Sequence, residues 1–210
     1  MKGPNVNIYK IQMAYFLEKK VQLEHLDLLV VCMPNLKMFF KTEPQSLPIP
    51  DEAPEDVPRC IWNDVNTSLT FNKVRLDFTF NIPSKFNWEQ LLTEFNKKIT
   101  VAIDEQEIII DRVGLVSELM SADSLHELLK EYIQINKFNS AGEANISWLE
   151  SIESYNVWTY FTINESKDIN KIVFDINSLP ECKLADQGTT GKEAVDKCAE
   201  LLKGKMINVL

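Results

Sequence analysis

The chain has 210 residues, of which 45% are hydrophobic and 10% aromatic, values that allow a globular core and exclude a wholly disordered chain. Its net charge of −9 and its shortage of arginine disfavour direct binding to nucleic acid, because phosphate recognition needs concentrated positive charge. The longest apolar run, residues 28–33, is too short to cross a bilayer, and the N-terminus shows no signal-peptide pattern. We therefore expect a cytoplasmic protein without membrane contact.

The first part of the chain predicts an opening pair of antiparallel strands. Residues 6–17 alternate loosely and are rich in β-forming side chains. Residues 21–33 end in an apolar run of strand length, which would be buried on both faces or enter an interface.

Residues 34–58 form a proline-rich, acidic arm. The arm holds six of the nine prolines, which fix the backbone and remove hydrogen-bond donors, so it cannot join the interior of a sheet or a helix. Two interpretations stay open. The arm is an extended, solvated connection, or it docks through its three large apolar side chains, Met38, Phe39 and Phe40. In the second case the acidic stretch 51–56 would stay exposed.

Residues 59–82 predict a β-meander of three short strands, at 59–62, 67–71 and 73–82, joined by polar turns. The third strand alternates strictly, with apolar side chains on one side and polar side chains on the other. This alternation is typical of a sheet with one buried face.

The clearest helix follows at 88–103. Pro83 ends the strand before it, Asn87 and Gln90 form a capping-box pattern, and apolar residues recur at 3.6-residue spacing. We expect the apolar side of this helix to pack on the meander.

The next segment predicts a strand at 107–120, in which Gly114 marks a bulge or a close backbone approach. A short helix is expected from 123 to 133.

Strands return within 143–177, and a second long helix ends the chain. Thr190 and Glu193 form its capping box, and an apolar stripe continues from Val195 to Val209.

These elements predict a single α+β domain, 1–210, with an antiparallel sheet and two long amphipathic helices packed on one face. Strands, a proline stop and a capped helix occur twice, which indicates a duplicated strand–helix unit with pseudo-repeats at 59–120 and 135–210. The two copies share little residue identity, so the duplication is a hypothesis.

No catalytic or metal-binding pattern is recognisable. The stretch GTTGKE, residues 188–193, precedes a helix as a phosphate loop would, but Asp186 and Glu193 replace the glycine and hydroxyl residue of that pattern. The four cysteines and two histidines lack the spacing of zinc ligands, and we expect buried thiols rather than disulfides. We therefore predict no catalytic residues, no cofactor and no metal.

Three parts of the chain resemble a known family. The run PRCIWNDVNTSLTFNKVRLDF, the helix at Trp88 and the segment DRVGLVSEL are similar to a sporadically distributed family of uncharacterised bacterial proteins, over about half of the chain. The family's arginine-aromatic continuation after GL is replaced here by Val116 and Ser117. The resemblance implies a bacterial, cytoplasmic sheet-and-helix protein and transfers no catalytic residues. The expected architecture is also similar in outline to small chaperones of the SecB kind.

Aromatic residues indicate where a partner would bind. Trp158 and Tyr160 lie on the nominally polar side of their strand, so a partner, a ligand or the arm should cover this side. We expect a non-enzymatic interaction subunit, adaptor or chaperone-like protein of a bacterial defence or toxin-control system. Its partner would be another protein or a second copy of the chain. The partner-binding residues predicted are Met38, Phe39, Phe40, Trp158 and Tyr160.

Two alternatives stay open. An apolar small-molecule-binding module would hold a cavity between helices and sheet, lined by Phe78, Phe80, Trp88 and Phe95, although the same residues make a solid core. An enzyme would need a site assembled only by the tertiary structure.

Overall fold

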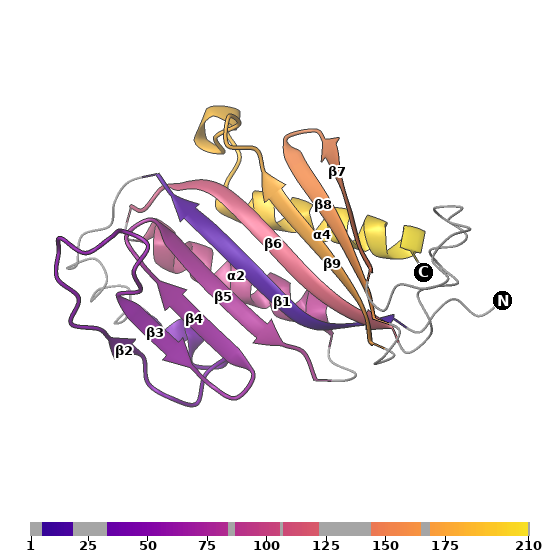
Figure 1. Cartoon of the computed structure of the whole chain (residues 1–210). Coiled ribbons are helices and arrows are strands. Elements are labelled where there is room, and N and C mark those ends of the chain that lie inside the picture. The colour runs from indigo at the N-terminus through magenta and orange to yellow at the C-terminus, as the bar shows by residue number, and fades with distance from the viewer. Residues whose placement is uncertain are drawn as a thin grey trace, which may run out of the picture.

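A single antiparallel sheet dominates the computed structural model, which describes residues 6–18, 33–83, 87–105, 107–121, 144–164 and 169–209 (Figure 1). The strand order is β2-β3-β4-β5-β1-β6-β9-β8-β7. In chain order the strands are β1 (Val6–Leu17), β2 (Gln45–Ser46), β3 (Cys60–Asn63), β4 (Thr67–Phe71), β5 (Arg75–Asn81), β6 (Ile110–Ser121), β7 (Ala144–Ile152), β8 (Tyr155–Asn164) and β9 (Ile169–Ser178). The described helices are η1 (Met33–Leu36), α2 (Trp88–Asp104), η2 (Ala185–Gln187) and α4 (Gly191–Val209).

The first strand lies at the centre of the sheet. β1 pairs with β5 on one side and with β6 on the other, so Met13 faces Phe78 across one seam and Leu115 across the other. All three side chains are buried, because alternate residues of paired strands point to the same face. The partner strand predicted at 21–33 lies outside the described residues, apart from Met33 in η1.

The meander predicted at 59–82 is confirmed as β3, β4 and β5. Asn72 makes the second turn: its side-chain oxygen accepts hydrogen bonds from the backbone N–H groups of Val74, at 2.9 Å, and Arg75, at 2.7 Å. This local side-chain bond replaces a ladder bond at the point where the chain reverses.

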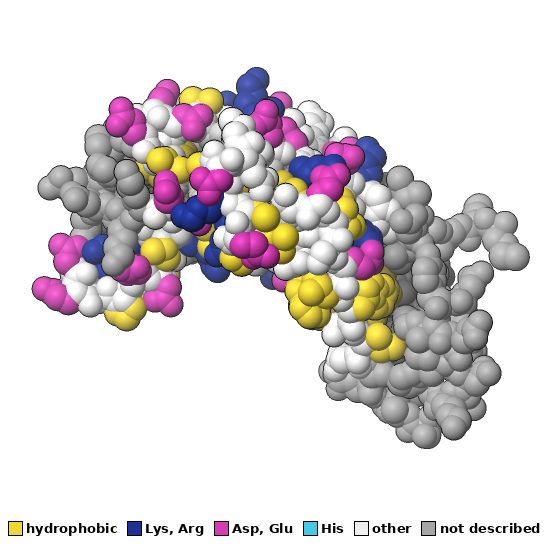
Figure 2. Space-filling view, turned by 90° about the horizontal axis from the view of Figure 1, so that it is seen from above, with side chains coloured by type: hydrophobic (Ala, Val, Ile, Leu, Met, Phe, Trp, Pro, Cys, Tyr) yellow, Lys and Arg dark blue, Asp and Glu magenta, His cyan; other side chains and the backbone are white. Residues whose placement is uncertain are grey.

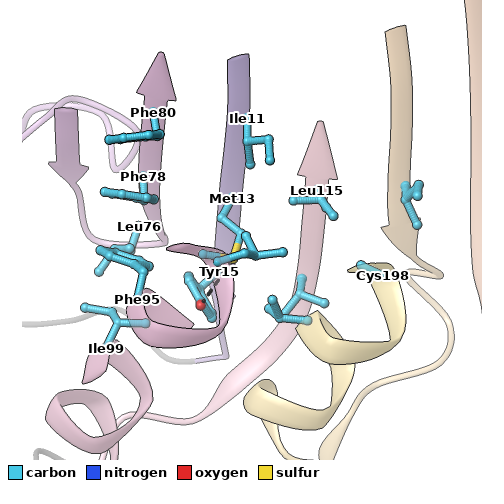
Figure 3. Close-up of a cluster of buried hydrophobic side chains, with 14 of the residues drawn as sticks. Ile11, Met13, Tyr15, Leu76, Phe78, Phe80, Phe95, Ile99, Leu115 and Cys198 are labelled. Carbon is cyan, nitrogen blue, oxygen red and sulfur yellow. Dashed lines mark hydrogen bonds between the residues drawn. The ribbon is translucent and has the colours of Figure 1, made fainter. Parts of the chain in front are cut away.

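The capped helix predicted at 88–103 is α2. The Asn87 side chain accepts a hydrogen bond from the backbone N–H of Gln90 at 3.1 Å. Phe95 stacks on Phe78 of β5 with ring centroids 3.6 Å apart, and both rings are buried (Figure 3). Both rings belong to the set expected to line a ligand cavity in the alternative interpretation, which stays a prediction.

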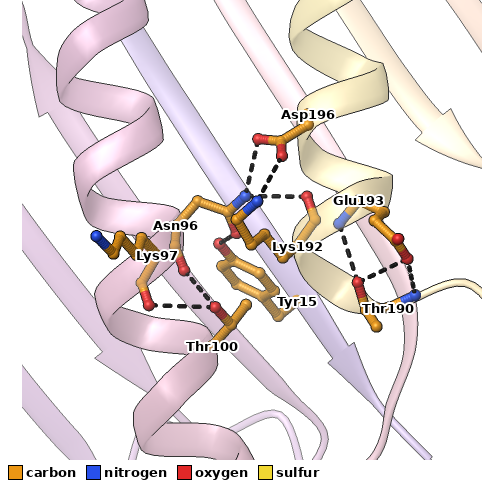
Figure 4. A network of polar contacts seen from close by, with 8 residues as sticks. All are labelled: Tyr15, Asn96, Lys97, Thr100, Thr190, Lys192, Glu193 and Asp196. Atoms are coloured by element: carbon orange, nitrogen blue, oxygen red, sulfur yellow. Dashed lines mark hydrogen bonds and ion pairs between the residues drawn. The ribbon is translucent and has the colours of Figure 1, made fainter.

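The capping box of α4 is confirmed. The backbone N–H of Thr190 donates to Glu193 at 2.8 Å, and the backbone N–H of Glu193 donates to the Thr190 hydroxyl at 3.2 Å (Figure 4). Gly191 opens the helix against β6, where a Cβ atom would lie 2.3 Å from Cδ1 of Ile110. The glycine therefore permits a close approach between helix and strand.

A buried polar network joins α2, β1 and α4. Asn96 accepts a hydrogen bond from the Tyr15 hydroxyl at 2.9 Å (Figure 4). Its amide donates to the Lys192 carbonyl at 3.0 Å and to the Asp196 carboxylate at 3.3 Å. Tyr15 and Asn96 are both 0% exposed, so the network fixes the relative position of three elements inside the protein.

The arm at 34–58 is packed onto the rest of the protein. Phe40 is 3% exposed and stacks on Trp62 with centroids 4.5 Å apart, and Phe39 lies edge-on to Phe95. Met38, in contrast, is 64% exposed, while Leu36 takes a buried position that the sequence did not indicate. Within the arm only the two-residue β2 joins the sheet, at its edge, as the prolines require.

A buried arginine holds the following part of the arm. Arg59 is 1% exposed and donates to the carbonyls of Ile49, at 2.8 Å, Pro50, at 2.7 Å, and Ala53, at 3.2 Å. Most of the acidic stretch 51–56 is exposed, with Glu55 and Ala53 half-buried.

The α+β class is confirmed in its coarse form, with a large antiparallel sheet and two long helices, and the sheet is the greater part. In Figure 1 both long helices are seen behind the strands. None of the described helices is long and apolar enough to span a membrane. The short helix expected at 123–133 lies outside the described residues.

Candidate functional site

One face of the sheet carries half-buried polar and aromatic side chains. We call it the outer face and define it by a row of residues that lie opposite one another on adjacent strands. The row runs from β5 to β7 through Thr79, Gln12, Val116, Asp175, Trp158 and Leu149. On β5, β1, β6, β9 and β8 these residues alternate with buried core residues, and on β7 Leu149 alternates with half-buried residues that pack against the core, so the row points to the other side of the sheet.

Hydrophobic groups gather where the outer face reaches β8 and β7. Trp158 and Tyr160 stack with ring centroids 5.9 Å apart and an angle of 16° between the rings. Tyr160 is 37% exposed, and Leu149, which lies opposite Trp158, is 44% exposed. We call these three residues the β8 patch. Hydrophobic side chains also gather on this side of the molecule in the view from above (Figure 2).

Asp175 borders the β8 patch as the neighbour of Trp158 on β9. Burial raises the pKa of Asp175, and a hydrogen bond from the Asn177 amide opposes this rise. Asn177 lies over Gly114, where a Cβ atom would come within 2.5 Å of the Asn177 oxygen. Gly114 therefore marks a close approach, as one of its two interpretations predicted, though to a side chain rather than to backbone.

A charged cluster lies on the outer face between β1, β6 and β9. Glu118 accepts hydrogen bonds from the Tyr9 hydroxyl and from Lys10, at 3.0 Å, and pairs with Lys171 at 2.5 Å. Burial alone would raise the pKa of Glu118, but the hydrogen bonds from Lys171, Tyr9 and Lys10 outweigh it and lower this pKa from 4.5 to about 2. The carboxylate is thus kept ionised and links three strands.

This lowered pKa predicts a particular acid sensitivity. A carboxyl group whose pKa falls on folding stabilises the folded state above its unfolded pKa and loses this effect as the pH falls toward its folded pKa. The difference in free energy of unfolding between the wild type and Glu118→Gln should therefore be largest above pH 4.5 and shrink toward pH 2. Urea unfolding across this range measures it, with Glu43→Gln, an exposed carboxylate paired with Lys37, as the control. A difference that does not change with pH would contradict the expectation.

The five residues predicted to bind a partner fall into two groups. Trp158 and Tyr160 lie together in the β8 patch. Phe39 and Phe40 pack within the protein, and Met38 is exposed beside them. Partner binding by any of these residues stays a prediction.

Sequence reasoning missed Leu149 and Asp175 as members of the outer face. The alternation of β7 and β9 places each on its face, but the neighbours across the strands follow only from the register.

Among the residues that the structure describes, no group of three or more histidine, cysteine, aspartate or glutamate side chains could hold a metal ion. Burial raises the pKa of the Cys198 thiol, which keeps this thiol protonated.

Comparison with protein-family models and with curated proteins found no match for this chain.

Proposed function

We propose that this chain is a non-enzymatic protein-interaction subunit, an adaptor or chaperone-like protein, that binds a protein partner or a second copy of itself through the β8 patch. The observation that carries the proposal is the stacked pair of Trp158 and Tyr160 beside the exposed Leu149. Large aromatic side chains contribute most to protein interfaces, and burying each would contribute roughly 1.5–3 kcal/mol.

The edge of the sheet next to the β8 patch also supports this proposal. β7 is an edge strand of nine residues, it contains no proline, and Glu150 is its one charged residue. A long edge strand of this kind offers backbone groups to another strand. The opposite edge, β2, has only two residues and is flanked by the prolines of the arm.

We also propose the finer architecture predicted from the sequence, with both helices on one face of a duplicated unit. Strand order supports a duplication whose units differ from the predicted pseudo-repeats 59–120 and 135–210. The first unit would hold β1, β3, β4, β5 and α2, and the second would hold β6, β7, β8, β9 and α4, so that β6 moves from the first unit to the second. The two units meet where β1 pairs with β6. Outward from this pair the strands follow in the order β1, β5, β4, β3 on one side and β6, β9, β8, β7 on the other, so each unit places its first strand innermost and its second strand outermost. Contacts of α2 with Phe78 and of α4 with β6 and β9 support the common helix layer.

The test of function replaces Trp158 and Tyr160 with serine together. We expect the double variant to weaken association with a partner or with itself at least about tenfold, because two central aromatic contacts are lost. Light scattering at several protein concentrations measures self-association. Association with a different protein is measured by the binding of a partner purified from the host. The melting temperature should fall less than on truncation of a core residue, since Tyr160 is already 37% exposed and Trp158 is only half-buried.

The matched control is Val65→Ser, which removes an exposed apolar side chain, 88% exposed, from the turn between β3 and β4. This control should associate as the wild type does. Two results together would refute the proposed function. The wild-type protein would be monomeric at every concentration, and every partner that it retains would also be retained by the double variant.

A further inference from the structure

A pocket of about 430 Å³ opens where β1 ends and β5 and β6 begin. Its apolar lining includes Phe16, Leu17 and Val74, and its charged lining includes Arg75, Arg112 and Asp56. Phe16 lies between Arg75 and Arg112 in the strand register, so one ring and two guanidinium groups share this end of the sheet. The volume is in the range of small-molecule sites.

Two of the three arginines of the chain meet on the ring of Phe16. The guanidinium carbon of Arg112 lies 4.5 Å from the ring centroid, and that of Arg75 lies 5.5 Å from it. Contact of a guanidinium with an aromatic face holds the planar cation in one orientation and leaves its N–H groups free to donate.

The two arginines differ in their partners. Arg75 donates from Nε to the Asp77 carboxylate at 2.6 Å, so its charge is matched. Arg112 pairs with no carboxylate among the described residues. The neighbouring carboxylate of Asp111 is itself paired with Lys183 at 3.3 Å. Within the described part of the chain, Arg112 is therefore a positioned cation at the wall of a pocket, with N–H groups that no carboxylate accepts from.

We propose that this pocket binds a small monocarboxylate with a flat apolar body, and that Arg112 holds the carboxylate. The planar guanidinium matches a carboxylate with two parallel hydrogen bonds. The apolar body of the ligand would contact Phe16, Leu17 and Val74. Asp56 and Asp111 also line the pocket, and their negative charge disfavours ligands with two or more negative charges. The inference goes beyond the proposed function, since the pocket lies on other strands than the β8 patch.

The experiment titrates the full chain with benzoate, with its neutral analogue benzamide, and with the dianion phthalate, by calorimetry and by NMR. We expect benzoate to bind and to change the backbone amide signals near Phe16, Val74 and Arg112, and the other two compounds to bind at least about tenfold more weakly. Arg112→Gln should weaken benzoate binding by a similar factor. The serine double variant of the β8 patch should bind benzoate as the wild type does, which separates this inference from the proposed function.

Lys37→Gln is the matched control, because it removes an exposed cation whose partner is Glu43 rather than a pocket residue. It should leave the affinity for benzoate unchanged. The inference is overturned if benzamide binds as tightly as benzoate, if the amide signals that change lie elsewhere, or if folded Arg112→Gln binds normally. The first two results come from the wild type alone, so they decide the question even where the variant does not fold.

Discussion

Replacing Phe40 with alanine should lower the free energy of unfolding by about 3–5 kcal/mol, the usual cost of emptying a buried aromatic position. Phe40 is 3% exposed, stacks on Trp62 at 4.5 Å and lies edge-on to Phe78 at 6.4 Å. Its removal would leave a cavity against two core rings. The arm would still be held by the Trp62 indole, which donates to the Thr42 carbonyl at 2.9 Å.

Met38→Ala is the control for this prediction. The two residues are close neighbours in the arm, but Met38 is 64% exposed, so its truncation should change stability by less than about 0.5 kcal/mol. Urea unfolding of both variants measures the difference. If both variants were as stable as the wild type, the arm would contribute nothing to the core, and its phenylalanines would again be candidates for partner binding.

In the arm, the backbone conformation could be predicted from the sequence, but the burial of individual side chains could not. Prolines predict correctly that it joins no sheet interior, because that consequence is local. Which of its apolar side chains are buried depends on surfaces elsewhere: Phe40 packs on Trp62 and Phe78, while Met38 is 64% exposed. No periodicity distinguishes adjacent residues of an irregular segment, so the pattern could not rank them.

Both long helices and the first meander could be predicted because their signals are short in range. Caps such as Thr190 with Glu193 act over three residues, and strand alternation acts over two. The position of β1 at the centre of the sheet is different. Its pairing with β5 and β6 joins residues far apart in the chain, such as Ala14 with Gly114, and carries no local signal.

In the candidate sites, too, features set by neighbouring residues could be predicted, and features set by strand pairing could not. Alternation alone placed Trp158 and Tyr160 on the polar side of their strand. The Glu118 cluster needs the register of three strands, since Tyr9 and Glu118 are 109 positions apart. The pocket at Arg112 likewise forms only because β1, β5 and β6 bring Phe16 between two arginines.

The buried network around Asn96 should be the most sensitive polar feature of the protein. Asn96→Ala removes the acceptor of the Tyr15 hydroxyl and the amide that donates to Lys192 and Asp196. Tyr15 is fully buried, and among the described residues its hydroxyl would keep only a weak hydrogen bond to the Met13 sulfur at 3.6 Å. We expect a loss of about 2–4 kcal/mol in the free energy of unfolding, because buried polar groups without a partner cost about 1–3 kcal/mol each.

A double-mutant cycle with Tyr15→Phe isolates this effect. Burial, followed by the nearby Asp196, raises the pKa of Tyr15 well above its ordinary value, so the hydroxyl stays protonated and acts as a donor. In the wild type, Tyr15→Phe should cost about 1–2 kcal/mol, since it removes the bond to Asn96. In the Asn96→Ala background the same change should be neutral or stabilising, because it removes a hydroxyl that has lost its acceptor. Costs that simply add in the double variant would show that Tyr15 and Asn96 are not coupled, and that the helices are positioned by apolar packing alone.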